Sequence, residues 1–216
     1  MTVCCVVIVP MLGRAEQVPR LVESLAASTD RARLLFVCTS GDTDVIGAVA
    51  GHDHHVIEPR PRGDYAAKVN LGVERSQEPM IFTGAIDLHF HPGWLDACER
   101  HLDERVQVVG TNDLANGRTA AGHSTHTLVT RDYAQLGLID GRPGLLCEDY
   151  LHEFVDDELV GTARHRDAYH HAADAVVEHL HPMAGKAEWD ATYLGMRRRM
   201  RADRALFRDR ERLWTT

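Results

Sequence analysis

The sequence predicts a single α/β domain, with a mostly parallel mixed sheet flanked by helices, followed by a C-terminal helical tail. The chain has 216 residues, 44% of them hydrophobic, which is enough for one sizeable core. Residues 3–9 form an apolar run rich in β-branched side chains, typical of a buried parallel strand. Strand and helix patterns then alternate over the first 110 residues, which favours parallel strands joined by right-handed helical crossovers.

The first half alternates regularly. Residues 17–27 predict an amphipathic helix, because Val18, Leu21 and Leu25 recur at helical spacing. Short apolar runs predict further strands at 34–38, 55–57, 80–82 and 106–110. Between them, further helices are predicted at 43–49, 65–74 and 94–102.

The second half is less regular. Strands are predicted at 124–130 and 175–178, and helices at 131–136, 148–159 and 187–212. Residues 197–212 contain neither Gly nor Pro and predict one continuous helix with eight arginines. We therefore divide the chain into a domain of residues 1–182 and a basic helical tail of residues 183–216.

Composition excludes several classes of protein. The net charge is −8, whereas proteins that wrap nucleic acid are usually basic. No apolar run approaches the roughly 20 residues that a membrane span needs, and the first residues lack the basic start and cleavage site of a signal peptide. Five scattered cysteines, without a Cys-x-x-Cys pair, predict reduced thiols and a cytoplasmic location.

The ends of the predicted strands indicate where a ligand binds. In an open α/β sheet, ligands lie beyond the carboxyl ends of the strands, which points to residues 10–14, 39–42 and 87–91. Arg14 and Lys68 are candidate phosphate contacts, because a guanidinium fork or an ammonium suits a diphosphate. Most of the tail arginines are expected to be ordinary solvated cations.

Asp87, His89 and His179 are candidate metal ligands. Asp87 follows an apolar strand, and a carboxylate there suits Mg²⁺ or Mn²⁺. His89 and His179 would shift the preference from Mg²⁺ towards Mn²⁺ or a later metal, with His91 and His181 as weaker candidates. The plain alternatives are an Asp that caps a turn and histidines in solvated loops.

Four segments, in order, resemble the nucleotide-sugar glycosyltransferases of the GT-A fold, chiefly the family 2 group. The first comprises residues 6–10, 14 and 21–25; the second 37–44; the third 63–72, 80–82, 87–89 and 92–95; the fourth 128–131, 136–140 and 148–151. Residues 174–179 are similar to the closing strand with its terminal His. The resemblance covers about residues 3–182 and implies a GT-A-like, Rossmann-type domain.

The resemblance also implies a function and a set of site residues. It implies metal-dependent transfer of a sugar, of hexosyltransferase type, from a nucleotide-diphosphate donor to a hydroxyl acceptor. A divalent metal, Mn²⁺ or Mg²⁺, would bind Asp87, His89 and His179. Asp149, beside Glu148, would be the general base that deprotonates the acceptor. The donor nucleotide would contact Pro10, Leu12, Arg14, Thr39, Ser40, Asp42, Lys68 and Asn70.

The sequence departs from the family pattern in three places. Thr39 and Ser40 stand where the family usually offers an Asp to a uracil imide, which favours guanosine- or thymidine-linked sugars. The metal motif is either Asp87-Leu88-His89, similar to the Asp-x-His of polypeptide N-acetylgalactosaminyltransferases, or residues 85–87 with the first Asp lost. There is no separate acceptor domain, so the acceptor stays open among protein, glycan, small molecule and modified DNA base, as does the stereochemistry.

Two other classes compete. A nucleotidyltransferase-like enzyme shares the opening strand, loop and helix, but it needs a Gly-rich loop with a Lys, and residues 10–14 contain one Gly. A basic-tailed protein that binds nucleic acid or metal would use the arginines and the 14 histidines, and the net charge of −8 counts against it.

Overall fold

The computed structural model describes residues 2–114 and 122–215, and it confirms the predicted α/β fold. One eight-stranded sheet has the strand order β3-β2-β1-β4-β7-β6-β8-β5. The strands are β1 (Cys5–Pro10), β2 (Ala32–Thr39), β3 (His54–Ile57), β4 (Met80–Thr83), β5 (Leu88–Phe90), β6 (Val108–Asn112), β7 (Thr127–Thr130) and β8 (Tyr169–His179).

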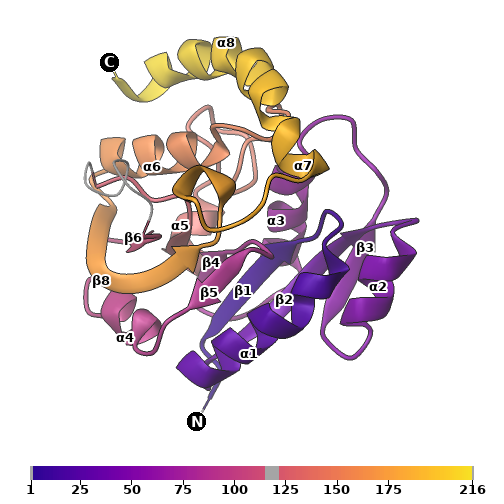
Figure 1. The fold of residues 1–216 in the computed structure, drawn as a ribbon. Helices are drawn as coiled ribbons and strands as arrows, with labels where there is room; N and C mark the ends of the chain where they lie inside the picture. The colour runs from indigo at the N-terminus through magenta and orange to yellow at the C-terminus, as the bar shows by residue number, and fades with distance from the viewer. Residues whose placement is uncertain (1, 115–121, 216) are drawn as a thin grey trace.

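Helices cover both faces of this sheet (Figure 1). They are α1 (Val18–Ser28), α2 (Thr43–Val49), α3 (Asp64–Glu74), α4 (Trp94–Glu99), α5 (Arg131–Gln135), α6 (Val155–His165), α7 (Ala191–Leu194) and α8 (Met196–Thr215). Two short 3₁₀ helices, η1 (Ala15–Gln17) and η3 (Pro182–Ala184), complete the described elements.

The sheet is mixed, and its parallel part is the N-terminal half. Strands β3, β2, β1 and β4 run parallel to one another, as the strand–helix alternation predicted. Strand β7 lies antiparallel between β4 and β6, β8 runs parallel to β6, and β5 pairs antiparallel with β8. The carboxyl ends of β1, β2 and β4 therefore lie at one edge, where a ligand site is expected.

Alternation along β1 divides the core into two halves. Val7 and Val9 pack with α1, α2 and α4 on one face. Val6 and Ile8 pack with α3, α5 and α6 on the other. A strand buried on both faces has no polar alternation, which explains the continuous apolar run at the start of the chain.

One predicted helix begins in the wrong place. Residues 148–154, predicted as the start of a helix, form turns, and α6 begins only at Val155. Phe154 precedes it in a left-handed conformation with φ 68°, which a helix cannot continue through. The backbone N–H groups of residues 151–153 instead donate to the buried carboxylate of Asp203 on α8.

The bounds of several strands also differ from prediction, and β7 begins at Thr127 rather than at residue 124. Strand β8 starts at Tyr169 rather than 175, because its first half consists of Tyr, His, Ala and Asp residues whose apolar signal is weak. Strand β5 was not predicted at all, since three residues are too few to show a period. In Figure 1, β8 is a long bent strand; its first half pairs with β6 and its second half pairs with β5.

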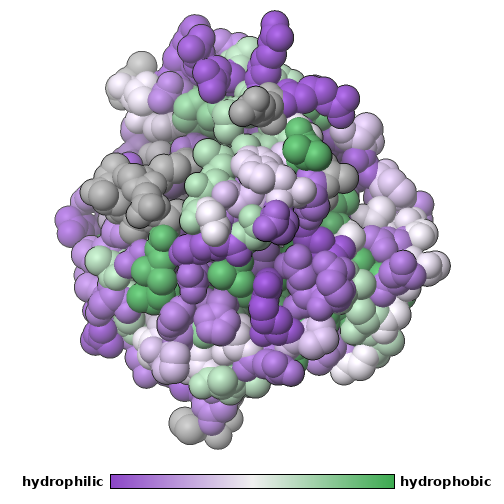
Figure 2. Space-filling view, viewed as in Figure 1, coloured by the Kyte–Doolittle hydropathy of each residue, from purple (hydrophilic) through white to green (hydrophobic). Residues whose placement is uncertain are grey.

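Residues 197–212 lie in one helix, α8, as predicted, and α8 packs on α6 (Figure 1). The helix predicted to begin at residue 187 instead begins at Ala191 and is interrupted at Gly195, which separates α7 from α8. Phe207 stacks on Phe154 with ring centroids 4.9 Å apart. Arg210 is 8% exposed and forms ion pairs with Glu158 on α6 and with Asp140. Figure 2 shows hydrophilic side chains over the upper part of the molecule, where α8 lies in the same view.

No helix within residues 2–114 and 122–215 is both long enough and apolar enough to cross a bilayer.

Candidate active site

Asp87 lies in the turn between β4 and β5, and three distant segments meet at its carboxylate. Its Oδ2 lies 3.2 Å from Arg14 Nη1, in the loop after β1, and 3.4 Å from His179 Nε2, at the end of β8. The same oxygen accepts a hydrogen bond from the Tyr193 hydroxyl of α7. Asp87 is buried, and its neighbours at this edge of the sheet are polar or charged.

Asp87 and His179 form a buried ion pair. Burial alone would raise the pKa of Asp87, but the charge and hydrogen bond of His179, with the Tyr193 hydroxyl, hold it well below its usual range. Burial lowers the pKa of His179, and the neighbouring Asp87 more than offsets this and raises it. The site therefore keeps a carboxylate and favours a cation beside it.

Arg14 occupies a strained position next to this pair. Its backbone is left-handed, with φ 60°, which costs a non-glycine residue about 1–3 kcal/mol. Its guanidinium lies 3.9 Å above the Tyr193 ring, and its Nε donates to Asp190 at 2.8 Å. Its Nη2 is buried without a hydrogen-bond partner among the described residues. An unpartnered guanidinium N–H of this kind suits an anionic oxygen such as that of a phosphate.

His126, at the start of β7, has a second unpartnered atom beside the pair. The residue is 3% exposed, and its Nδ1 lies 2.6 Å from the Thr83 carbonyl oxygen. Its Nε2 has no partner in the described part of the chain, and its ring centroid lies 5.1 Å from that of His179. Burial, and then the charge of His179, lower the pKa of His126 to about 4.

These residues fit a divalent cation with an anionic ligand. A carboxylate and an imidazole form a donor set that suits Mn²⁺ or Mg²⁺. Buried polar atoms without partners are rare in proteins, and both Arg14 Nη2 and His126 Nε2 flank this one pair. Asp87 and His179 are thus brought together as predicted, and His126 is a neighbour that the sequence did not single out.

His89 is not brought to this pair. It lies on β5 opposite Glu178, between the buried Leu88 and Phe90, and its ring packs on His91 at 5.1 Å. The contacts described for His89 do not reach Asp87 or His179. Its placement favours the interpretation of residues 85–87 as the metal motif with its first acid missing.

The predicted nucleotide-side loops do lie side by side. Pro10 ends β1, and the Gly13 N–H in the following loop donates to Asp42 Oδ2 at 3.2 Å. Asp42 also caps α2 by accepting the Val45 N–H. Leu12 in this loop is half exposed, and the Ser40 hydroxyl donates to Glu58 at 3.0 Å. Glu58 is an exposed carboxylate close to Thr39 and Ser40, where the family pattern would have an Asp.

Lys68 was predicted to contact phosphate, and the structure contradicts this. Its side chain is fully buried, and its ammonium donates to the Met11 carbonyl at 2.6 Å. It also donates to Thr39 Oγ1 and Asp64 Oδ2, both at 2.7 Å. Because an ammonium has three hydrogens, none is left for a ligand. Lys68 instead fixes the β1 and β2 ends to α3.

Asn70 was predicted as a nucleotide contact, and it also has a different role. Its Oδ1 accepts the N–H groups of Leu145 and Leu146 at 2.9 and 3.0 Å. Its Nδ2 donates to the Leu146 carbonyl at 2.9 Å and to Glu148 at 3.0 Å. Asn70 is therefore saturated by the 145–148 segment, which it holds against α3.

Glu148 and Asp149 lie in the turns before α6 and are both paired with arginines. Glu148 lies 2.8 Å from Arg60, and Asp149 lies 2.7 Å from Arg142. The hydrogen bond from Arg142 lowers the pKa of Asp149 below its ordinary value. A carboxylate held by an arginine is a weaker base than a free one.

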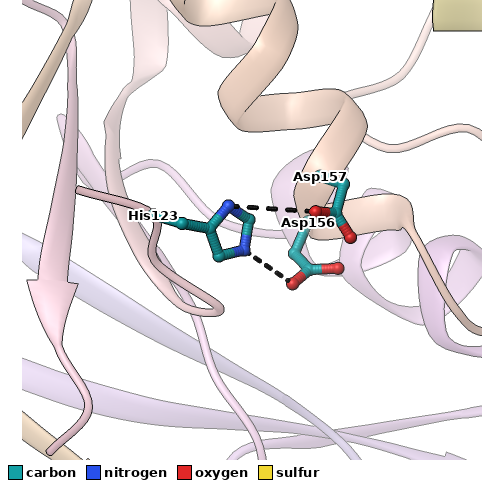
Figure 3. A group of neighbouring side chains, drawn as sticks. All are labelled: His123, Asp156 and Asp157. Carbon is teal, nitrogen blue, oxygen red and sulfur yellow. Dashed lines mark hydrogen bonds and ion pairs between the residues drawn. The ribbon is translucent and has the colours of Figure 1, made fainter. Parts of the chain in front are cut away.

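A second acid pair, which the sequence prediction missed, begins α6. His123 Nε2 lies 3.2 Å from Asp156 Oδ2, and its Nδ1 lies 3.9 Å from Asp157 Oδ1 (Figure 3). Their ligand atoms lie within 4.8 Å of one another. Besides burial and Asp87, the charges of Asp113 and then Asp156 act on His179 and raise its pKa. The sequence feature that could have indicated this group was the pair of consecutive acids, Asp156 and Asp157, in the first turn of a helix.

A shallow, open cavity of about 630 Å³ lies elsewhere, against Tyr133, Arg166 and Ala168 at the start of β8. His179 is at the opposite end of that strand. We place the candidate site at Asp87, because Arg14 and His179 lie against its carboxylate and two buried atoms without partners, Arg14 Nη2 and His126 Nε2, flank it.

Comparison with protein-family models gives no match, and neither does comparison with curated proteins. Solved structures do match. A mannosyltransferase from Pyrobaculum calidifontis, in complex with GDP-Man and Mn²⁺, aligns over 85% of this chain with TM-score 0.64 and 14% identity. This chain spans only 58% of that enzyme.

Glucosyl-3-phosphoglycerate synthase from Mycobacterium tuberculosis, in complex with phosphoglyceric acid, aligns over 94% of this chain and 79% of its own, with TM-score 0.62 and 16% identity. The same enzyme with Mn²⁺ and UDP-glucose aligns with TM-score 0.61 and 15% identity. At such identities the likeness concerns the fold. The chain therefore has the GT-A fold of nucleotide-sugar glycosyltransferases.

Proposed function

We propose that this protein is a metal-dependent glycosyltransferase, of hexosyltransferase type, that moves a sugar from a nucleotide-diphosphate donor to a hydroxyl acceptor. The observation that supports this most is the buried Asp87–His179 pair with Arg14 beside it, at the carboxyl edge of a GT-A sheet. Structures of this fold in complex with GDP-Man and Mn²⁺ or UDP-glucose and Mn²⁺ support the same ligand class.

On this proposal, Asp87 and His179 hold the divalent ion. When bound, such an ion neutralises the diphosphate leaving group. Arg14 supplies a second positive charge, and its unpartnered Nη2 donates to a phosphate oxygen. The strained backbone of Arg14 directs the guanidinium at the carboxylate, so the same loop that ends β1 positions the donor.

The general base is either Asp149, which the resemblance implies, or Asp156. Asp149 is paired with Arg142, which weakens it as a base. Asp156 is paired with His123, and its charge reaches His179. A base serves an inverting displacement by taking the proton of the acceptor hydroxyl. We favour Asp156, and both are tested below.

We further propose a guanosine-linked donor, because Thr39 and Ser40 replace the Asp that would read a uracil imide, and the thymine of a thymidine-linked sugar carries that same imide. The Thr39 hydroxyl accepts from Lys68 and Ser40 donates to Glu58, so both side chains are already engaged. A cytoplasmic location is supported by the five free cysteines. The acceptor is a hydroxyl compound. Its class is to be found by a second screen, which uses the donor identified in the first.

The test is a screen of nucleotide sugars for metal-dependent release of the nucleotide, with thermal unfolding measured in parallel. A ligand that binds only the native state raises the free energy of unfolding by RT ln(1 + [L]/Kd), and the melting temperature rises with it. We expect a GDP-sugar with Mn²⁺ to stabilise the protein and to release its nucleotide, ahead of UDP- and dTDP-sugars. No stabilisation and no release by any nucleotide sugar, with and without Mn²⁺ or Mg²⁺, would contradict the proposal.

A further inference from the structure

Two histidines flank His179, and their hydrogen bonds leave them in opposite states. The Nδ1 of His126 lies 2.6 Å from the Thr83 carbonyl oxygen, which can only accept, so this Nδ1 must bear a hydrogen. The Nδ1 of His181 accepts the Met183 N–H at 3.1 Å, so it bears none. In its neutral form, the His126 ring therefore has its unshared electron pair on Nε2, where it is free. The His181 ring has its unshared electron pair on Nδ1, where it already accepts the hydrogen bond from Met183.

The free electron pair of His126 lies in the protein interior. The residue is 3% exposed, and its Nε2 has no hydrogen-bond partner in the described part of the chain. A buried acceptor without a partner is unfavourable and is usually satisfied by a ligand, water or ion. His126 does not belong to the predicted ligand set, so the proposed function does not account for it.

Its distance from His179 suits a shared ion. The two ring centroids lie 5.1 Å apart at an interplanar angle of 80°. Two imidazoles that ligate one ion through bonds of about 2.1 Å have ring centroids roughly 4.5–5.5 Å apart. The His181 ring lies 5.0 Å from His179, so distance alone does not separate the two neighbours, whereas the state of the electron pair does.

We propose that His126 is a third protein ligand, through Nε2, of the divalent ion held by Asp87 and His179, and that it makes the site select Mn²⁺ over Mg²⁺. This rests on the proposed function, since it concerns the same site. A hydrogen bond from the other ring nitrogen to a backbone carbonyl is the usual support of a ligating His, and Thr83 supplies it. Imidazole suits Mn²⁺ and later metals, whereas Mg²⁺ prefers oxygen ligands and retains water.

The donors must draw together when the ion binds. Among the described residues, the three possible ligands that lie within 4.8 Å of one another are His123, Asp156 and Asp157. The donor atoms of Asp87, His126 and His179 are therefore spaced more widely than this before an ion binds. Asp87 Oδ2 accepts hydrogen bonds from Arg14 and Tyr193, so the carboxylate reaches the ion only by exchanging these bonds for it. His126 is fixed by Thr83 and by its stacking on Phe82.

The experiment measures Mn²⁺ and Mg²⁺ binding to the full chain by calorimetry, without donor or acceptor. His126→Asn retains a side-chain N–H for the Thr83 carbonyl and removes Nε2. The matched control is His181→Asn, whose amide oxygen still accepts the Met183 N–H. We expect His126→Asn to weaken Mn²⁺ binding by about 10–100-fold, with a much smaller change for Mg²⁺. The control should keep the Mn²⁺ over Mg²⁺ preference.

Asp87→Asn separates this inference from the proposed function. If Asp87→Asn binds Mn²⁺ as tightly as the parent, the site is not at Asp87 and the proposed function fails. If Asp87→Asn loses Mn²⁺ while His126→Asn keeps the parental preference, only the inference is overturned. Should His126→Asn fail to fold, pulsed EPR of Mn²⁺ on the parent protein counts the bound imidazole nitrogens. Two coupled nitrogens support the inference, and one overturns it.

Discussion

At the scale of single residues, Asp87 balances two buried cations. Its carboxylate faces both Arg14 and His179, whose side chains are 10% and 15% exposed. Removing one member of a buried ion pair leaves the partner charge without compensation, at about 3–5 kcal/mol. Asp87 therefore has a structural task in addition to the proposed metal ligation.

We expect Asp87→Asn to abolish metal-dependent turnover and to lower the free energy of unfolding by about 3 kcal/mol. Asp96→Asn is the matched control, since Asp96 pairs with Arg31 on the surface and should cost below about 1 kcal/mol. Steady-state kinetics with the donor found in the screen, together with urea unfolding, measure both effects. Near-parental turnover of Asp87→Asn would contradict the assignment of the metal site.

The two candidate bases can be compared by the same substitution. Asp156→Asn should lower kcat by about 10²–10⁴, with donor binding nearly unchanged, if Asp156 takes the acceptor proton. Asp149→Asn should then have a small effect, because Asp149 is engaged by Arg142. Single-turnover kinetics separate the chemical step from donor binding. The reverse order of effects would restore Asp149, and no effect from either would favour a retaining mechanism.

His152 is a residue whose protonation opposes folding. Burial, followed by the charge of Arg199, lowers the pKa of His152 to about 4 from its ordinary 6.5. Between pH 6.5 and 4 the unfolded chain binds the proton more readily, so the stability attributable to this ring falls as the pH falls through that window.

His152→Gln should therefore reduce the loss of stability between pH 6.5 and 4, by up to about 3 kcal/mol. Urea unfolding at several pH values measures this slope. His165→Gln, at the exposed end of α6, is the control and should keep the parental slope. An unchanged slope in His152→Gln would show that other groups produce the acid sensitivity.

At the scale of elements, α8 fixes the start of α6 through Asp203. This carboxylate is fully buried and accepts the N–H groups of Leu151, His152 and Glu153 at 2.8, 3.0 and 3.0 Å. It satisfies donors that would otherwise be buried without partners, and it holds residues 151–153 out of the helix.

Asp203→Asn should destabilise the protein by about 2–4 kcal/mol, because an amide accepts fewer of these bonds and lacks the charge. Asp209→Asn on the same helix is the control, since Asp209 is exposed beside Arg212. Thermal unfolding monitored by circular dichroism distinguishes them. Equal melting temperatures for the two variants would show that the 151–153 turn does not need this carboxylate.

At the scale of the whole molecule, residues 183–215 complete both the core and the site. Arg210 compensates Glu158, which is 4% exposed on α6, and Tyr193 covers Asp87. The arginines on the outer side of α8 remain in water. The C-terminal end is therefore positively charged, although the net charge of the whole chain is −8.

We predict that a chain ending at Lys186 does not fold cooperatively, because Glu158 and the 151–153 turn lose their partners together. Circular dichroism and size-exclusion chromatography of the truncated chain measure this. A truncated chain that keeps a cooperative transition within a few degrees of the parent, but loses donor affinity, would instead make the segment a removable lid.

The sequence by itself determined the elements whose signals are local. The apolar run of β1, the helical spacing of α1 and the Asp42 cap that starts α2 depend on neighbours within a few positions. The order of strands and helices then follows from short connections and right-handed crossovers. The positions of Asp87 and His179 at strand ends were readable for the same reason, since a strand end is a local feature.

Only the tertiary structure decided which polar residues are free for a ligand. Lys68 bonds with residues 29 and 57 positions away, and Asn70 with residues 75 to 78 positions away, so their saturation has no local signal. The start of α6 depends on Asp203, about 50 residues later. The separation of His89 from Asp87, and the nearness of His126 to His179, follow from strand pairing. A period of 2 or 3.6 residues reports only which face is buried, whereas a hydrogen-bond partner depends on which distant segments the folded chain brings into contact.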